Sequence, residues 1–263
     1  MDLQLKGLKA LVTGSSRGLG FATAMELARE GCSVVINGRN SNNLSKAAYQ
    51  IEADTGFKPL AIPGDLTEPE FPLQLVRQAA EAMNSLDLLV TNSGGPPPGR
   101  FEEIDDSTWQ NAINTSFLCH TRLIRAGLPY LRQSRAASVI TVTSYSVKQP
   151  LPNLILSNSI RLATIGLTKS LALELGEDGI RFNSILPAWT MTERVEELMA
   201  ARARARRTTI EEELAQQAQD SPFKRMGRPE EVAKAAVFLL SPAASYITGV
   251  MLTVDGGMYK GML

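Results

Sequence analysis

Four polar residues in the middle of the chain, Asn114, Ser144, Ser157 and Arg161, could bind and orient an oxygen-rich ligand. Ser144 ends an apolar run, and Ser157 and Arg161 stand four residues apart, so that on a helix they share one face. An aliphatic hydroxyl can hydrogen-bond a substrate oxygen. A guanidinium can bind ribose hydroxyls or a carboxylate, but it keeps its proton in the working pH range. These residues therefore predict a site that binds a polar ligand but contains no group acidic enough to donate a proton readily.

The stretch 13–20 reads Thr-Gly-Ser-Ser-Arg-Gly-Leu-Gly. An apolar run at 10–12 precedes it and a helical pattern at 21–30 follows, so its glycines lie in a strand-to-helix turn. Glycine permits a tight turn and close approach of a ligand, and the helix start favours an anion. The stretch predicts a site for the pyrophosphate of a dinucleotide, with an ordinary glycine-rich turn as the alternative. The candidate binding residues are Gly14, Ser16, Arg17, Gly18, Leu19 and Gly20.

The elements that would position these residues alternate regularly along the chain. Strands are expected at 8–13, 33–37, 59–62, 86–91, 137–143, 180–186 and 250–254. Helices are expected at 19–30, 41–55, 68–83, 105–132, 154–176 and 229–240. This alternation predicts an α/β fold in which helices cover both faces of a parallel sheet. No repeat or linker interrupts it, so we expect a single domain over residues 1–263. Ligands of such sheets bind beyond the carboxyl ends of the strands.

The residues after the second strand bear on the choice of cofactor. An acidic residue there would bind ribose hydroxyls and repel a 2′-phosphate, but this chain has Arg39. Together with Arg17 it favours NADP, with NAD possible, unless both arginines are only solvated surface residues. Asp65 can accept a hydrogen bond from the adenine amino group, cap the next helix, or both. The residues after the third and fourth strands complete the predicted site: Asp65, Leu66, Asn92, Ser93 and Gly94.

Composition excludes several classes of function. Lys plus Arg and Asp plus Glu number 27 each, which gives no electrostatic reason for binding nucleic acid or a membrane surface. No apolar run reaches the ~20 residues of a membrane helix, and no secretory leader is visible, so we expect a cytoplasmic protein. Cys32 and Cys119 lack metal or redox spacing, and we expect them and His120 to be packing residues, with no metal site.

The chain resembles the short-chain dehydrogenase/reductase family, in particular its 3-oxoacyl-(acyl-carrier-protein) reductase-like members. Residues 13–20 are similar to its Thr-Gly-x-x-x-Gly-x-Gly turn, and 92–95 stand where the family has Asn-Asn-Ala-Gly. Gly-Arg-Pro-Glu-Glu-Val at 227–232, followed by 246–249 and 254–257, resembles its C-terminal segment. The resemblance covers essentially the whole chain. It implies a Rossmann-type, doubly wound sheet of seven parallel strands and hydride transfer between a nicotinamide and a carbonyl or alcohol.

The resemblance also marks where this sequence departs from the family, which uses Ser, Asn and a Tyr-x-x-x-Lys pair. Ser144 and Asn114 match the first two positions, whereas Ser157 and Arg161 stand at the Tyr and Lys positions. Tyr145 is a candidate substitute acid. If the strand continued, its side chain would point away from that of Ser144, and if the chain had already turned, it could reach the site.

The segment after the sixth strand corresponds to further cofactor contacts and to the family's substrate lid. The resemblance implies that Pro187, Thr190 and Thr192 bind the carboxamide or pyrophosphate, and that 193–225 forms a helical lid. The arginines of this lid could bind an anionic substrate, but the sequence favours a solvated helix face. The resemblance further implies a homodimer or homotetramer.

Three functions fit these observations. The first is an NADP-preferring oxidoreductase with an atypical site, acting on a small-molecule carbonyl or alcohol; Ser144 and Asn114 polarise the oxygen, and Arg161 holds ribose or substrate. Its proton comes from Tyr145, from Ser157 with water, or from the substrate itself. The second is a catalytically inactive NADP-binding sensor or partner subunit. In the third, Arg161 binds a carboxylate and supports non-redox chemistry. The intact cofactor motifs favour the first.

Overall fold

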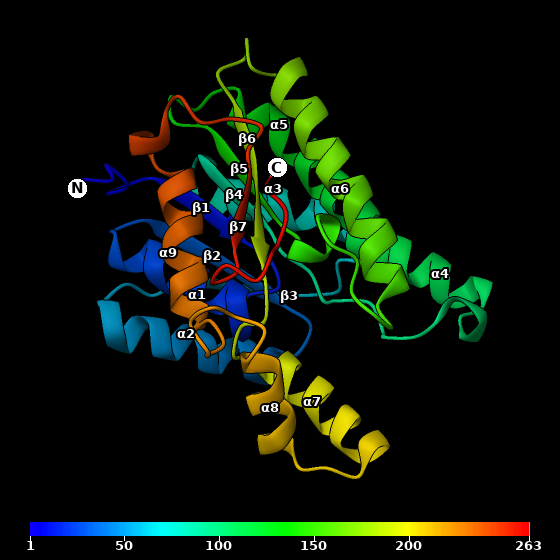
Figure 1. Cartoon of the computed structure of the whole chain (residues 1–263). Coiled ribbons are helices and arrows are strands. Elements are labelled where there is room, and N and C mark those ends of the chain that lie inside the picture. Colours follow the sequence, from blue (N-terminus) through cyan, green and yellow to red (C-terminus); the bar gives the residue numbers. More distant parts are fainter. Residues whose placement is uncertain (263) are drawn as a thin grey trace.

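A sheet of seven parallel strands forms the centre of the molecule in the computed structural model, which describes residues 1–262 (Figure 1). The strand order is β3-β2-β1-β4-β5-β6-β7. Strands β1 to β3 are therefore added on one side of the β1–β4 junction, and strands β4 to β7 on the other side. This confirms the predicted doubly wound α/β fold. The strands are β1 (Lys9–Val12), β2 (Ser33–Gly38), β3 (Leu60–Pro63), β4 (Leu88–Thr91), β5 (Ser138–Val142), β6 (Arg181–Pro187) and β7 (Met251–Val254).

Successive side chains of a strand point to opposite faces of the sheet, and in these strands both sets are apolar. Helices therefore cover both faces of the sheet. Ala10, Val12 and Ile36 pack beneath α1 (Gly18–Arg29), α2 (Ser41–Thr55) and α9 (Pro229–Leu240). Leu11 and Val35 belong to the core on the other face. Three helices cover that face: α3 (Phe71–Met83), α5 (Cys119–Leu131) and α6 (Ile155–Glu174).

Two predicted helices differ from those observed. The span 105–132 is divided into α4 (Asp106–Ile113), a π-helical turn (Asn114–Leu118) and α5. The hydrogen bonds of the π-helical turn join residues five apart instead of four, which interrupts the α-helix although the apolar pattern continues. The helix expected from 68 begins at Phe71, with Pro72 in its first turn, where a missing N–H costs nothing.

The region 193–225 contains two helices, α7 (Glu193–Arg206) and α8 (Ile210–Ala218), which project from the sheet edge beside the strand carboxyl ends (Figure 1). Thr192 caps α7 by accepting a hydrogen bond from the Val195 N–H, and Thr209 caps α8 in the same way from Glu212. Within residues 1–262 there are also three short 3₁₀ turns: Phe101–Glu103, Tyr145–Val147 and Pro242–Ala244.

Candidate functional site

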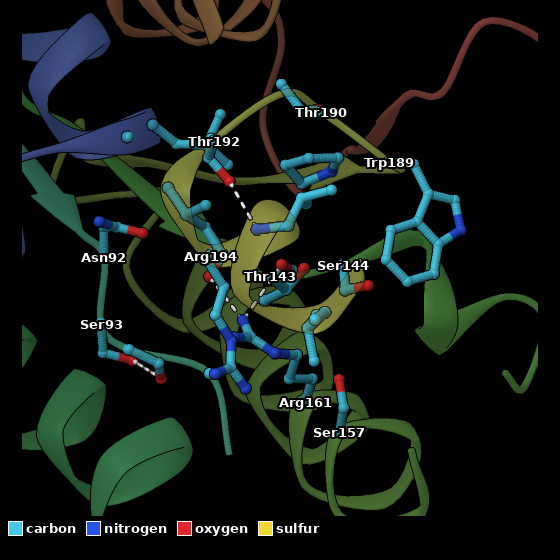
Figure 2. Close-up of a pocket in the computed structure, with 18 of the residues that line it drawn as sticks. Asn92, Ser93, Thr143, Ser144, Ser157, Arg161, Trp189, Thr190, Thr192 and Arg194 are labelled. Atoms are coloured by element: carbon cyan, nitrogen blue, oxygen red, sulfur yellow. Dashed lines mark hydrogen bonds between the residues drawn. The ribbon is translucent and has the colours of Figure 1, made fainter. Parts of the chain in front are cut away.

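A cavity of about 310 Å³ lies at the carboxyl ends of the strands, where the strand order reverses, and Figure 2 shows the side chains around it. Four segments distant in sequence form its walls: the glycine turn, the loop after β4, the end of β5 with the start of α6, and the segment from β6 into α7. Predicted site residues that line it are Gly14, Arg17, Gly18, Leu19, Asn92, Ser93, Gly94, Ser144, Tyr145, Ser157, Arg161, Pro187, Thr190 and Thr192.

The glycine turn forms a backbone cradle at one wall. Gly14 and Gly18 have φ values of +57° and +59°, and a Cβ on Gly14 would lie 2.7 Å from the Asn92 carbonyl oxygen. The Asn92 side-chain amide donates to the Gly14 carbonyl at 3.0 Å, which fixes the turn against the end of β4. Among residues 1–262, no side chain forms a capping hydrogen bond at the start of α1. These donors and the space left by the missing side chains fit a pyrophosphate.

Five predicted cofactor-binding residues lie outside the cavity lining: Ser16 and Gly20 in the stretch 13–20, and Arg39, Asp65 and Leu66 after β2 and β3. Arg39 is exposed, and its Nη1 lies 3.8 Å from Asp65 Oδ2. Asp65 Oδ1 also accepts hydrogen bonds from the Thr67 N–H and hydroxyl, both at 2.9 Å, so it closes a turn as well as facing Arg39. Ser16 lies against Gly38, whereas the Leu66 side chain is buried beside α3. This end of the site is an open surface.

Ser144, Ser157 and Arg161 meet in the cavity floor. Ser144 Oγ accepts from the Ser146 N–H at 3.2 Å, and the hydroxyls of Ser146 and Ser157 are 3.3 Å apart. Arg161 Nη1 donates to the carbonyl of Val142 at 3.2 Å and to the next carbonyl at 3.1 Å. Arg161 is thus anchored to the end of β5 and lies beside both serines (Figure 2).

Tyr145 lies three residues beyond the end of β5 and begins a 3₁₀ turn, so the chain has turned and Tyr145 lines the cavity wall. It is buried and packs in one apolar cluster with Trp189. Burial raises the pKa of the Tyr145 phenol, which opposes formation of a phenolate near neutral pH. The position permits proton donation, and the environment favours the protonated form.

Asn114 and His120 do not line the cavity. Asn114 begins the π-helical turn, and its Oδ1 accepts from Arg122 Nη2 at 3.4 Å. His120 is buried, with Nδ1 2.8 Å from Thr91 Oγ1 and Nε2 3.4 Å from the hydroxyl of Ser93, which does line the cavity. Burial lowers the pKa of His120 to about 3, so the imidazole is neutral.

Helix α7 places Arg194 in the cavity lining and Arg202 against a residue of the cavity wall, and the sequence assigned neither of them to the site. Arg194 follows the cap of α7, and its Nη2 donates to the Pro96 carbonyl at 3.1 Å across the cavity mouth. Arg202 lies 4.8 Å from the ring centre of Trp189, a cavity-wall residue. The prediction of a solvated lid face fits exposed Arg204 but not these two side chains.

Arg17 also connects the glycine turn to the lid. Its Nη1 lies 3.2 Å from Glu197 Oε1 on α7, and both side chains are about half exposed. Glu197 Oε2 lies 3.7 Å from Arg194 Nη1. One lid carboxylate is therefore shared between an arginine of the predicted phosphate site and an arginine at the cavity mouth.

The part of the chain that the structure describes contains neither a membrane-spanning helix nor a cluster of metal-binding side chains. Within residues 1–262, every helix is too short or too polar to cross a membrane. Among the same residues, no group of three or more His, Cys, Asp or Glu side chains could hold a metal ion. Cys32 and Cys119 are both buried, and burial raises their pKa values to about 12 and about 11, respectively.

Comparison with known proteins adds independent findings. Residues 14–259 match the family model described as enoyl-(acyl carrier protein) reductase. A short chain dehydrogenase/reductase of Aspergillus oryzae is 31% identical over 97% of this chain and 95% of its own. Gluconate 5-dehydrogenase of Gluconobacter oxydans is 31% identical over the same shares. The structure of L-sorbose reductase from Gluconobacter frateurii, complexed with NADPH and L-sorbose, superposes with a TM-score of 0.95, 30% identity and full coverage of both chains.

Proposed function

The chain belongs to the short-chain dehydrogenase/reductase family, and on that premise we propose that it is an NADP(H)-dependent oxidoreductase with an atypical active site. It interconverts a carbonyl and an alcohol in a small molecule. The observation that carries this proposal is the continuity of the site. The glycine cradle, with uncapped N–H donors, opens into the cavity that holds Ser144, Ser157 and Arg161.

The cofactor site consists of a backbone part and a charged part. The backbone at Gly14 and Gly18 holds the pyrophosphate, while Arg39 binds the 2′-phosphate and Asp65 the adenine amino group. Thr192 lines the cavity next to the cradle, because a Cβ built on Gly18 would lie 3.6 Å from its Cγ2. NADPH, when bound, supplies the hydride for carbonyl reduction. The L-sorbose reductase complex contains this cofactor, which supports the choice of NADP.

The remaining residues of the floor act on the substrate oxygen. The Ser144 and Ser157 hydroxyls donate hydrogen bonds to it, and the positive charge of Arg161 stabilises negative charge that develops there. A serine hydroxyl is too weak an acid to replace a phenol by itself. Ser157 therefore passes on a proton from water, and Tyr145 is the alternative donor because its phenol also lines the cavity.

Oxidation of NADPH, followed at 340 nm with a panel of ketones, oxo acids and aldoses, tests this proposal. We expect turnover of at least one substrate, and a loss of kcat in S144A and S157A of about 10²- to 10³-fold each, as for oxyanion donors. The matched control is S159A, because Ser159 is exposed on the same helix as Ser157, outside the cavity. Equal activity of S144A, S157A and S159A would contradict the assigned roles.

A second function is favoured by one observation, the replacement of the Tyr-x-x-x-Lys pair by Ser157 and Arg161. In that case the protein binds NADPH as a sensor or as a partner subunit and does not turn it over. One result distinguishes the two functions. If the protein binds NADPH but does not oxidise it with any substrate of the panel, the second function is supported. Restoring Tyr and Lys in the double variant S157Y/R161K would then be expected to create activity.

Association into a homodimer or homotetramer and a cytoplasmic location complete the proposal. Leu162 and Leu173 on α6 are 53% and 75% exposed, which supports contact between copies along this helix. Light scattering coupled to size exclusion measures the mass of the assembly. Cell fractionation measures the location.

A further inference from the structure

Arg161 is a buried cation without a counter-ion. It is 8% exposed, and no carboxylate among residues 1–262 forms an ion pair with it. Its Nη1 is satisfied by two β5 carbonyls, but carbonyl dipoles do not neutralise a full charge. Burial lowers its pKa only to about 10, so it is charged at neutral pH. An unpaired buried charge is costly, which indicates that an anion from outside the chain completes the site.

Arg194 brings a second cation to the same place. A Cβ built on Gly95 would lie 3.6 Å from Arg161 Nη2 and 4.0 Å from Arg194 Nε, so both guanidinium groups flank the space that this glycine leaves open. Figure 2 shows the two side chains side by side in the cavity. The only carboxylate paired with Arg194 among the described residues is that of Glu197, at 3.7 Å, which is also 3.2 Å from Arg17. Arg161 and Arg194 together form an arginine pair that suits a planar, bidentate anion.

The wall beside the arginine pair is apolar. Trp189 is buried in it, with Leu154 and Leu198 close to the cavity as partly buried lining residues. In Figure 2, Ser144 lies between Trp189 and the arginine pair, and Ser157 lies next to Arg161. The hydroxyls expected to bind the reacting oxygen thus have a cationic region on one side and an aromatic surface on the other.

We propose that the substrate is an organic carboxylate, such as a 2-oxo acid, held by its carboxylate between Arg161 and Arg194 and by its apolar body against Trp189. This inference rests on the proposed function, because it names the class of molecule on which that site acts. The pyrophosphate cradle lies at Gly14 and Gly18, on the wall formed by the start of α1, whereas the arginine pair lies beside the two serines. The anion is therefore assigned to the substrate and not to the cofactor.

Matched pairs of ligands test the assignment. Pyruvate, 2-oxoisovalerate and phenylpyruvate are each compared with the neutral ketone in which a methyl group replaces the carboxylate. Calorimetry measures their binding to the protein with and without NADP⁺, and NADPH oxidation measures kcat/KM. We expect at least one acid to bind ten-fold or more tightly than its ketone, an advantage that added salt reduces.

The variant R194Q should reduce that advantage by about ten-fold, because it removes one of the two charges of the arginine pair. R204Q is the matched control, since Arg204 is exposed on the same helix and does not line the cavity. R194Q is preferred to a change of Arg161, whose anchoring of β5 could affect folding. Circular dichroism and thermal unfolding check that both variants fold.

The possible results separate the two proposals. If acids bind no better than ketones, or if R194Q and R204Q behave alike, the carboxylate inference is wrong, while turnover of ketones would leave the oxidoreductase proposal standing. If R194Q weakens NADPH binding and not acid binding, the anion belongs to the cofactor and the inference is also wrong. If acids bind through Arg194 but NADPH is never oxidised, the anion site stands and the oxidoreductase proposal fails.

Discussion

Arg39 offers a sharp test of cofactor choice because it is assigned to a group that NADPH has and NADH lacks. Its side chain is 77% exposed, and its nearest acidic atom, Asp65 Oδ2, lies 3.8 Å away. That distance is beyond a hydrogen bond, and such an exposed pair contributes about 0–1 kcal/mol. Arg39 can therefore turn toward a 2′-phosphate at little cost. The informative change is R39Q, which removes the charge and keeps much of the side-chain volume.

The expected size of the effect follows from this geometry. A hydrogen bond between an arginine and a phosphate contributes about 1.5–3 kcal/mol. R39Q should then weaken NADPH binding by about 10- to 150-fold. NADH binding should change by less than about two-fold, because no phosphate occupies its 2′-position. The ratio of the two dissociation constants should fall toward unity.

Calorimetric titration of both cofactors into the parent, R39Q and R77Q measures that ratio. Arg77 is the matched control, since it is also exposed and lies 3.8 Å from a carboxylate, Glu81, on α3. Equal losses for NADPH and NADH in R39Q would show that Arg39 acts on the structure of the site and not on the phosphate. Unchanged NADPH binding would refute its assignment.

Three further changes test other parts of the site. G14A, which puts a Cβ 2.7 Å from the Asn92 carbonyl at φ +57°, should weaken NADPH binding by at least about ten-fold in calorimetry; normal affinity would disprove the cradle. R161K cannot reproduce the guanidinium contacts at the end of β5, so urea unfolding should show a loss of about 1–3 kcal/mol, and an unchanged midpoint would contradict the anchoring role. His120 has a folded-state pKa of about 3, below its ordinary value of ~6.5. As the pH falls, the unfolded state therefore takes up the proton first. The stability that is present above pH ~6.5 is lost as the pH falls toward 3. From pH 7.5 to 5 this loss should be about 2 kcal/mol in urea unfolding, and it should be absent in H120Q; the same slope in both proteins would show that His120 is not its source.

The sequence was sufficient to predict the sheet and the contact between the glycine turn and the loop after β4. Each strand is a short apolar run beside turn residues, and a parallel sheet places the residues after its strands along one edge. Asn92 illustrates this, since its position after β4 was enough to bring it to Gly14, where its amide donates at 3.0 Å. The predicted C-terminal end of the helix at 105–132 also agrees with the structure to within one residue, since α5 ends at Leu131 and Arg132 caps it.

The rest depended on tertiary contacts that no local pattern encodes. Arg194 reaches Pro96 because α7 folds over the cavity, and nothing around Arg194 in the sequence distinguishes it from the solvated arginines of the same helix. Trp189 was not predicted as a site residue, although its position just after β6, at the edge where ligands bind, was a signal that could have indicated it. The π-helical turn at Asn114 was hidden, since one extra residue per turn barely alters the apolar pattern.

Transfer of a labelled hydride tests the central claim most directly. NADPH carrying deuterium at C4, prepared separately in each of its two stereochemical forms, is incubated with the protein and the best substrate of the panel, and the product is analysed by mass spectrometry. An oxidoreductase of this kind should place one deuterium on the former carbonyl carbon from one form of the cofactor and none from the other. Cofactor binding without any labelled alcohol, for every substrate in the panel, would contradict the claim and leave a protein that binds NADPH without using it.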